Sequence, residues 1–187
     1  MADLVYTANV SVDGYLEDAD GRIDWSEPAE EVFSFITDLE RQAGTYLYGR
    51  RMYEAMVYWE TAAPDEPYVR EFAEMWRDAD KVVYSRTLEA ASSARTRLEH
   101  DFDPEAVRRL KAAAARRITI VGADLAGQAL AAGLVDEVRL LTVPVVLGGG
   151  KPALPKGAKL PLRLLETRQF ASGVVFLRYR VDSGRGT

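Results

Sequence analysis

Short apolar runs alternate with amphipathic segments along most of the chain. Runs rich in β-branched and aromatic residues cover residues 4–10, 45–48, 81–84, 117–121 and 138–143. Their length and composition are typical of buried strands, and the segments between them include several of helical periodicity. Strands that alternate with helices predict an α/β domain.

Four segments carry start or stop signals for helices. Residues 28–41 begin with a proline, place two glutamates in the first turn and repeat apolar residues at helical spacing. Residues 68–77 follow a loop with two prolines, and Asp103 precedes a proline at the start of an alanine-rich run. Residues 125–132 are followed by Gly133, which suits a helix C-terminus.

The C-terminal part shows a different pattern. Two strand-like runs, residues 163–170 and 174–181, flank the short segment 171–173, whose glycine suits a tight turn. This arrangement predicts an antiparallel hairpin. Residues 182–187 are expected to form a loose tail, and since no linker or repeat divides the chain, residues 1–187 are expected to form one domain.

Candidate chemistry lies where the strands end. The run 45–48 ends at Gly49 and leads into a helix-compatible segment, so free backbone N–H groups are expected there for an anion. Arg50 adds a guanidinium, which pairs with phosphate through two parallel hydrogen bonds and favours NADPH over NADH. The alternative is an exposed arginine on an ordinary turn between strand and helix.

Two other strand ends carry similar residues. The run 117–121 leads into a small-residue turn before a helix, although Asp124 could instead serve as an ordinary helix N-cap. The run 81–84 ends in a serine and an arginine. The candidate cofactor-binding residues at the three ends are Gly49, Arg50, Arg51, Ser85, Arg86, Val121, Gly122, Ala123, Asp124 and Leu125.

Seven short motifs, taken in order, resemble the dihydrofolate reductase-like superfamily, in particular the branch related to the C-terminal reductase domain of the bifunctional riboflavin-biosynthesis deaminase-reductase. The resemblance spans nearly the whole chain. It implies a single-domain three-layer fold, with a mostly parallel central sheet, a C-terminal antiparallel hairpin and helices on both faces. The motifs are residues 8–15, 21–25, 48–51, 82–86, 121–126, 133–137 and 144–148.

The resemblance also implies an activity: NADPH-dependent hydride transfer to a C=N or C=O bond of a pteridine- or ribosylaminopyrimidine-like molecule. Such a step leaves negative charge on the heteroatom, which a nearby acid can neutralise. By the same resemblance Glu30 takes the position of a substrate-binding acid, and Asp13 is the second candidate acid. Asn9 and Trp25 are candidate substrate-binding residues.

Each of these residues also has a purely structural alternative. Glu30 suits the first turn of a helix, Asp13 suits a turn before Gly14, and Trp25 suits a loop anchor. Dihydrofolate reductase activity is the first alternative function. A non-catalytic NADP-binding module is the second, because an acid that riboflavin-pathway reductases usually carry is absent beside Gly122.

Composition narrows the choice of partner. The net charge of −5 argues against nucleic acid, so a small-molecule substrate is expected. The chain has no cysteine and one histidine, which excludes disulfides, thiolate catalysis and multi-histidine metal sites within one chain, and no metal is expected. Without a leader-like or membrane-spanning apolar run, the protein is expected to be cytoplasmic. The apolar run 138–147 leads us to expect a homodimer.

Overall fold

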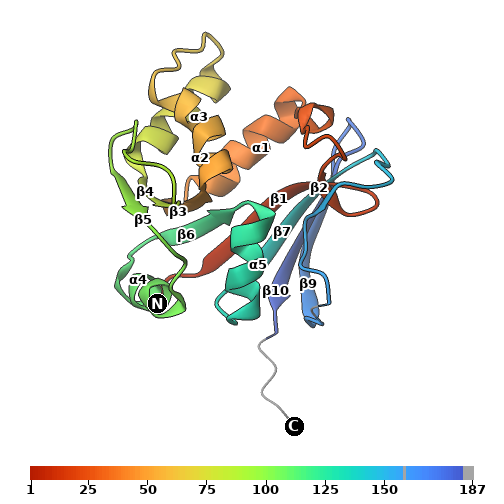
Figure 1. Ribbon diagram of the computed structural model, residues 1–187. Coiled ribbons are helices and arrows are strands. Elements are labelled where there is room, and N and C mark those ends of the chain that lie inside the picture. The colour runs from red at the N-terminus through yellow and green to blue at the C-terminus, as the bar shows by residue number, and fades with distance from the viewer. Residues whose placement is uncertain (158, 183–187) are drawn as a thin grey trace.

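The computed structural model describes residues 1–157 and 159–182, and within them a main sheet has eight strands in the order β5-β4-β3-β6-β1-β7-β10-β9 (Figure 1). All pairs from β5 to β7 are parallel, whereas β10 is antiparallel to both neighbours. This confirms the predicted mostly parallel sheet with a C-terminal hairpin. The strands are β1 Leu4–Ser11, β3 Ala43–Gly49, β4 Asp80–Tyr84, β5 Thr96–Glu99, β6 Arg117–Val121, β7 Glu137–Val143, β9 Leu162–Gln169 and β10 Val175–Val181.

Helices cover both faces of this sheet, which completes the predicted three layers (Figure 1). One face carries α1 Glu30–Glu40, α2 Arg50–Met56 and α3 Pro67–Asp78, and the other carries α4 Pro104–Ala113 and α5 Ala123–Ala131. Two short 3₁₀ helices, η1 Asp24–Ser26 and η2 Val57–Glu60, and a small sheet of β2 Tyr15–Glu17 with β8 Lys151–Pro152 complete the fold.

The alternation of side chains along each strand separates two cores. Leu4 and Tyr6 of β1 pack with Ile118 and Ile120 of β6 beneath α4 and α5. On the opposite face, Tyr46 and Tyr48 of β3 pack beneath α3, where the Trp76 indole N–H donates to the Tyr48 hydroxyl at 3.1 Å. A further cluster around Phe35 of α1 and Phe176 of β10 extends this second core.

The structure corrects three local predictions. Helix α1 begins at Glu30 after an extended Ala29, so Pro28 lies before the helix and not in its first turn. Helix α5 begins at Ala123, two residues earlier than predicted, and Gly122 occupies the N-cap; Asp124 therefore lies in the first turn. Strand β5 was missed because it is a short edge strand of mainly polar residues with no buried position.

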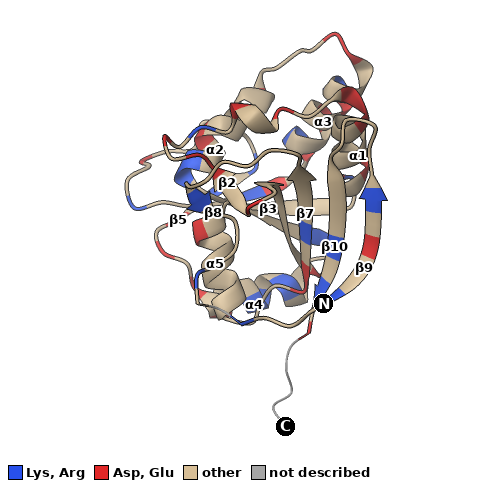
Figure 2. Ribbon diagram, turned by 90° about the vertical axis from the view of Figure 1, so that its right-hand side faces the viewer, with Lys and Arg blue, Asp and Glu red and all other residues tan. Residues whose placement is uncertain are grey.

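The edge strand β9 carries more charged residues than the strands at the centre of the sheet. Acidic and basic residues, among them Arg163, Glu166 and Arg168, follow one another along β9 at one edge (Figure 2). Interspersed charges of this kind disfavour edge-to-edge pairing. The apolar strand β7, by contrast, lies inside the sheet between β1 and β10. Of the predicted loose tail, residues 183–187 lie outside the described residues.

Candidate functional site

Strand β3 pairs in parallel with β4 on one side and with β6 on the other. The carboxyl ends of the three strands therefore lie at the same edge of the sheet. A groove of about 290 Å³ opens there. Five of the candidate cofactor-binding residues line it, namely Gly49, Ser85, Arg86, Asp124 and Leu125. The structure thus brings together residues that are far apart in the sequence, as the strand-end argument requires.

Two arginines converge on the loop that follows β4. The Arg50 Nη1 donates to the Thr87 hydroxyl at 2.6 Å, while its Nε donates to Glu54 at 2.7 Å. The Arg86 Nε donates to Asp101 Oδ1 at 2.7 Å. Hydrogen bonds from His100 and Arg86 hold the pKa of Asp101 below its usual value. Both guanidiniums are therefore preoriented by carboxylates, with which an incoming phosphate would compete.

Arg51 and Ala123, which do not line this groove, and Asp124, which does, make contacts elsewhere. Arg51 is largely exposed and pairs with Glu17 of β2 at 3.4 Å. Asp124 pairs with Lys151 of β8 at 2.5 Å, so the charge of this first-turn carboxylate is compensated. Ala123 begins α5 and lines a neighbouring hollow together with Asp124.

Gly122, two residues before the groove residue Asp124, lines a second hollow. It has a φ of +99°, a conformation that L side chains rarely adopt, and nothing lies within 4 Å of the position that a Cβ would take. Backbone here is thus open to close approach by a ligand, at the N-terminus of a nine-residue helix. Val121 and Gly122 also line the second hollow.

This second hollow is an apolar cavity of about 290 Å³ beneath α1, α2 and α3. Its walls include a cluster of Phe33, Trp59 and Phe72, whose rings lie 5.1 to 6.2 Å apart in tilted or edge-on contacts. Met52 and Met56 of α2 contribute flexible apolar side chains. Such a lining suits a flat, largely apolar ligand.

One end of the cavity is polar and closed. Glu40, the last residue of α1, is only 5% exposed, and its Oε2 accepts a hydrogen bond of 2.8 Å from the Thr119 hydroxyl of β6. Tyr46 of β3 lies beside the same carboxyl. The Tyr46 hydroxyl and the Glu40 carboxyl act on each other's pKa as hydrogen-bond partners, in a looser geometry than the Thr119 bond.

Burial raises the pKa of Glu40, and the Thr119 hydrogen bond and the Arg139 charge only partly offset this effect. Sequence reasoning missed this acid. A signal was present, because Glu40 follows Phe33 and Ile36 at helical spacing and so falls on the apolar face of α1. An acid on such a face is buried, and a buried acid needs a partner.

The two acids predicted from the sequence occupy other positions. Glu30 is exposed in the first turn of α1 and is not part of the cavity wall. Asp13 accepts hydrogen bonds from the Ser11 hydroxyl at 2.7 Å and from the backbone N–H groups of Leu147 and Gly148 at 3.1 and 2.7 Å. These bonds, that of Ser11 first, lower the pKa of Asp13 and tie the loop after β1 to residues 147–148.

Of the two candidate substrate-binding residues, one lines the cavity and the other does not. Asn9 of β1 lines the cavity, and its contact with substrate stays a prediction. Trp25 lies in η1 and donates its indole N–H to the Arg22 carbonyl at 3.1 Å. Its neighbours Ile23 and Ser26 line the cavity instead, and Ile23 is 51% exposed at the open end.

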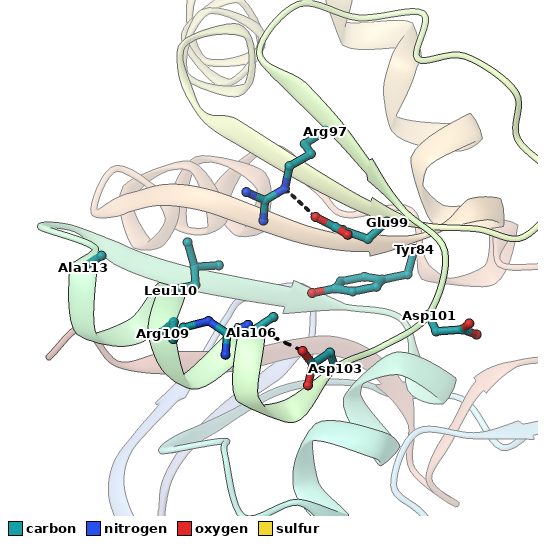
Figure 3. Close-up of a pocket in the computed structure, with 9 residues that line it drawn as sticks. All are labelled: Tyr84, Arg97, Glu99, Asp101, Asp103, Ala106, Arg109, Leu110 and Ala113. Carbon is teal, nitrogen blue, oxygen red and sulfur yellow. Dashed lines mark ion pairs between the residues drawn. The ribbon is translucent and has the colours of Figure 1, made fainter.

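A third hollow, of about 490 Å³, lies between β5 and α4 (Figure 3). The Tyr84 ring lies between Glu99 of β5 and the start of α4, and burial raises the pKa of Tyr84 to about 12. Arg97 pairs with Glu99 at 2.8 Å, and Arg109 lies 3.6 Å from Asp103. Each of these four side chains has a partner of opposite charge, so they give the hollow no preference for a cation or an anion.

Two further features of residues 1–157 and 159–182 bear on the class of site. They hold no group of three histidine, cysteine or acidic side chains arranged for a metal ion. No helix in this part of the chain is long and apolar enough to cross a bilayer.

Comparisons with known proteins place these features in a family. Residues 2–176 match the family described as the RibD C-terminal domain. Two proteins of Bacillus subtilis strain 168, both called uncharacterized, are similar: YyaP is 32% identical over 91% of this chain and 90% of its own length, and YwjB is 27% identical over 88% and 90%.

Solved structures share the fold. A putative riboflavin biosynthesis protein from Shewanella sp. PV-4 has a TM-score of 0.74 at 21% identity, covering 97% of this chain and 99% of its own. A diaminohydroxyphosphoribosylaminopyrimidine deaminase/5-amino-6-(5-phosphoribosylamino)uracil reductase from Thermotoga maritima has a TM-score of 0.68 at 14% identity. Here 96% of this chain matches 56% of the longer protein.

Proposed function

Because the chain belongs to the RibD C-terminal domain family, we propose that it is an NADPH-dependent reductase of the riboflavin-biosynthesis reductase type. The observation that carries the proposal is that the groove and the apolar cavity both border the first turn of α5. Asp124 and Leu125 line the groove, while Val121 and Gly122 line the cavity, so one extended ligand can occupy both across the first turn of α5.

The residues present fit NADPH. Gly122 leaves its backbone open, and Arg50 and Arg86 supply positive charge beside the groove for a phosphate monoester. NADPH supplies a hydride when bound. The chain holds the dinucleotide at the strand ends, and Asn9 and Val121 at the cavity wall then border the substrate. The cavity walls exclude water from the reacting atoms.

The substrate class follows from the same site. A C=N or C=O bond of a pteridine- or ribosylaminopyrimidine-like ring is the proposed hydride acceptor, because the aromatic lining suits a flat ring. Dihydrofolate is the alternative substrate. A module that binds NADP without turnover is the alternative of another class, and the absence beside Gly122 of the acid that riboflavin-pathway reductases usually carry favours it.

Steady-state oxidation of NADPH, followed by its absorbance with a panel of pteridines and aminopyrimidines, tests the proposal. Substrate-dependent oxidation is expected with at least one ring of this class. Tight NADPH binding without oxidation by any member would instead support the non-catalytic module. Dihydrofolate belongs in the panel because its reduction would select the first alternative.

The source of the proton stays a prediction from the sequence, with Glu30 and Asp13 as its two candidates. If either delivers the proton, Glu30→Gln or Asp13→Asn lowers turnover by roughly 10²- to 10⁴-fold and leaves NADPH affinity unchanged. Asp13→Asn also removes an acceptor for the 147–148 N–H groups. A loss caused by a loosened loop would therefore appear as faster proteolysis there.

We also propose a homodimer. The apolar strand β7 is buried within one chain, so the contact surface has to lie elsewhere in the C-terminal part of the sheet. Leu164 and Leu165 of β9 are large apolar side chains at its surface, and Leu164 is 53% exposed. Light scattering at micromolar concentration is expected to give about twice the 20.8 kDa chain mass. A monomer mass would contradict the proposal.

A further inference from the structure

We infer that Asp101 determines how strongly the groove prefers NADPH to NADH: its carboxylate accepts a hydrogen bond from the 2′-hydroxyl of the cofactor's adenosine ribose and opposes a phosphate at that position. The inference rests on the proposed function, which places this ribose and its phosphate monoester beside Arg50 and Arg86. Its first support is position, because Asp101 lines the groove together with Arg86 and His100.

Asp101 and the extra phosphate of NADPH compete for one guanidinium. The Arg86 Nε donates to Asp101 Oδ1 at 2.7 Å, and Arg86 Nη2 lies 2.5 Å from the same oxygen. A phosphate monoester that binds Arg86 therefore comes to lie beside a carboxylate. Because two negative charges at such short range repel each other, Asp101 lowers the affinity for the phosphate that Arg86 provides.

A ribose hydroxyl is favoured at the same place. A carboxylate accepts hydrogen bonds and a hydroxyl can donate one, and such a bond is stronger than one between neutral groups. Arg86 occupies Asp101 Oδ1, whereas Oδ2 lies 3.0 Å from His100 Nδ1 and has a further lone pair. The Asp101 side chain is 57% exposed, so a ligand in the groove can reach this oxygen.

The Asp101 carboxyl is charged at neutral pH. Hydrogen bonds from His100 and Arg86 lower its pKa, which keeps it an acceptor. Figure 3 shows this carboxylate pointing away from Arg97 and Arg109, the two arginines of the hollow between β5 and α4. Its printed partners are those of the groove, so its charge acts on a ligand bound there.

Two other acids near the groove differ from Asp101. Glu54 accepts from Arg50 Nε at 2.7 Å but is not part of the groove wall. Asp124 lines the groove, and Lys151 at 2.5 Å compensates its charge. In dinucleotide sites an acid binds the ribose 2′-hydroxyl and an arginine the 2′-phosphate. The groove holds both kinds of residue, and Asp101 is the acid placed to bind the hydroxyl.

Three adenine nucleotides that differ only at the 2′ position test the inference without turnover. They are 2′-deoxyadenosine 5′-monophosphate, adenosine 5′-monophosphate (AMP) and adenosine 2′,5′-bisphosphate. With the wild-type chain, isothermal titration is expected to show about ten-fold tighter binding of AMP than of the deoxy compound, the effect of one hydrogen bond to a charged group. Equal affinities of these two would overturn the inference. This comparison needs no variant, so it does not depend on how well one folds.

Asp101→Asn is the matching variant. Its amide oxygen can still accept from Arg86, while an NH₂ group replaces Oδ2 and the negative charge is lost. AMP and the deoxy compound are expected to bind this variant equally. The preference for the bisphosphate over AMP is expected to rise by at least about ten-fold relative to the wild-type chain, and the preference for NADPH over NADH to rise with it.

A purely structural role of Asp101 predicts a change of the opposite sign. If Asp101 only held the Arg86 guanidinium in place, Asp101→Asn would weaken binding of the bisphosphate and leave the comparison of AMP with the deoxy compound unchanged. That pattern would overturn the inference.

Asp103→Asn is the control for loss of a nearby negative charge. Asp103 is the N-cap of α4, accepts from the Glu105 N–H at 2.9 Å and is not part of the groove wall. Asparagine caps a helix about as well as aspartate, so the start of α4 is kept. Both preferences are expected to stay at their wild-type values. If Asp103→Asn changed them as much as Asp101→Asn, net charge and not contact with the ribose would set the preference, and the inference would fail.

The outcomes also separate this inference from the proposed function. If the three nucleotides bind with the expected preferences but NADPH is never oxidised, the role of Asp101 stands and the reductase proposal falls. If NADPH is oxidised while AMP and the deoxy compound bind equally, the reductase proposal stands and the role of Asp101 falls. If the wild-type chain binds none of the three nucleotides, the groove is not a nucleotide site and both fall.

Discussion

The groove at the strand ends and the apolar cavity beneath α1 to α3 both border the first turn of α5 but differ in the chemistry of their walls. Arg86 lines the groove and Arg50 lies near it, bonded to Thr87, and exposed carboxylates hold both guanidiniums in place. The cavity is lined by aromatic and aliphatic side chains, with the buried acid Glu40 at its closed end. Exposed charge favours binding of a phosphorylated cofactor, whereas an aromatic and aliphatic lining favours a flat, largely apolar ligand.

Closing the space at Gly122 is expected to give the largest effect, because both regions depend on it. In Gly122→Val a side chain occupies the open space beside the backbone, and we expect NADPH affinity to fall by roughly 100-fold, about 2.7 kcal/mol. Isothermal titration measures this change. Unchanged affinity would show that the cofactor does not approach this turn.

Gly133→Val is the matched control for backbone strain. Gly133 also has a positive φ, of +64°, and open space around it, but it follows the far end of α5. Both variants are expected to lose about 1 to 2 kcal/mol of stability from the left-handed backbone, measured by thermal melting. NADPH affinity is expected to fall in Gly122→Val alone.

The arginines of the groove are expected to contribute less. If each binds the extra phosphate of NADPH, Arg50→Ala and Arg86→Ala each lower NADPH affinity by about ten-fold and leave NADH affinity unchanged. Their competing carboxylates, Glu54 and Asp101, reduce the gain from each contact. Fluorescence titration of both nucleotides measures the ratio, with the exposed Arg108→Ala on α4 as control. An unchanged ratio would remove the arginines from the cofactor site.

The groove was easier to predict from the sequence than the closed end of the cavity, for a physical reason. A strand that ends in glycine before a helix is a local pattern, so Gly49 and Gly122 could be identified from their neighbours in sequence. Parallel pairing then brings the ends together without further information. The fold was predictable on the same grounds, apart from the polar edge strand β5, whose burial pattern carries no alternation.

The closed end of the cavity depends on contacts that are distant in sequence. Glu40 and Thr119 are 79 residues apart, and only the packing of α1 on β6 brings them into contact. In the sequence Glu40 stands between a leucine and an arginine at a helix end, where an exposed acid is the usual outcome. Glu30 lies in the first helical turn, where an acid is favourable, so the sequence indicated Glu30 and not Glu40, although Glu30 is exposed.

The smallest expected effect is a change in stability with pH, and it tests the burial of Glu40 directly. Burial raises the pKa of Glu40 in the folded chain above its unfolded value, so the folded state binds this proton more tightly. The resulting stabilisation is fully present below the unfolded pKa of about 4.3 and is lost as the pH rises through the raised folded pKa. Glu40→Gln has no such proton and no such loss.

The measurement is the difference in melting temperature between Glu40→Gln and the wild-type chain from pH 4 to pH 8. The difference is expected to shift in favour of the variant as the pH rises. The other titrating groups contribute equally to the melting temperatures of both chains, so their effects cancel to first order in the difference. Glu30→Gln shows the change in melting temperature that loss of an exposed acid causes. Arg139, Arg117, Tyr46 and Thr119 act on the Glu40 carboxyl, and both arginines favour its charged form. If the two arginine charges outweighed burial, the difference in melting temperature would shift in favour of the wild-type chain as the pH rises. Glu40 would then be a charged group, and the cavity would not differ from the groove in being uncharged.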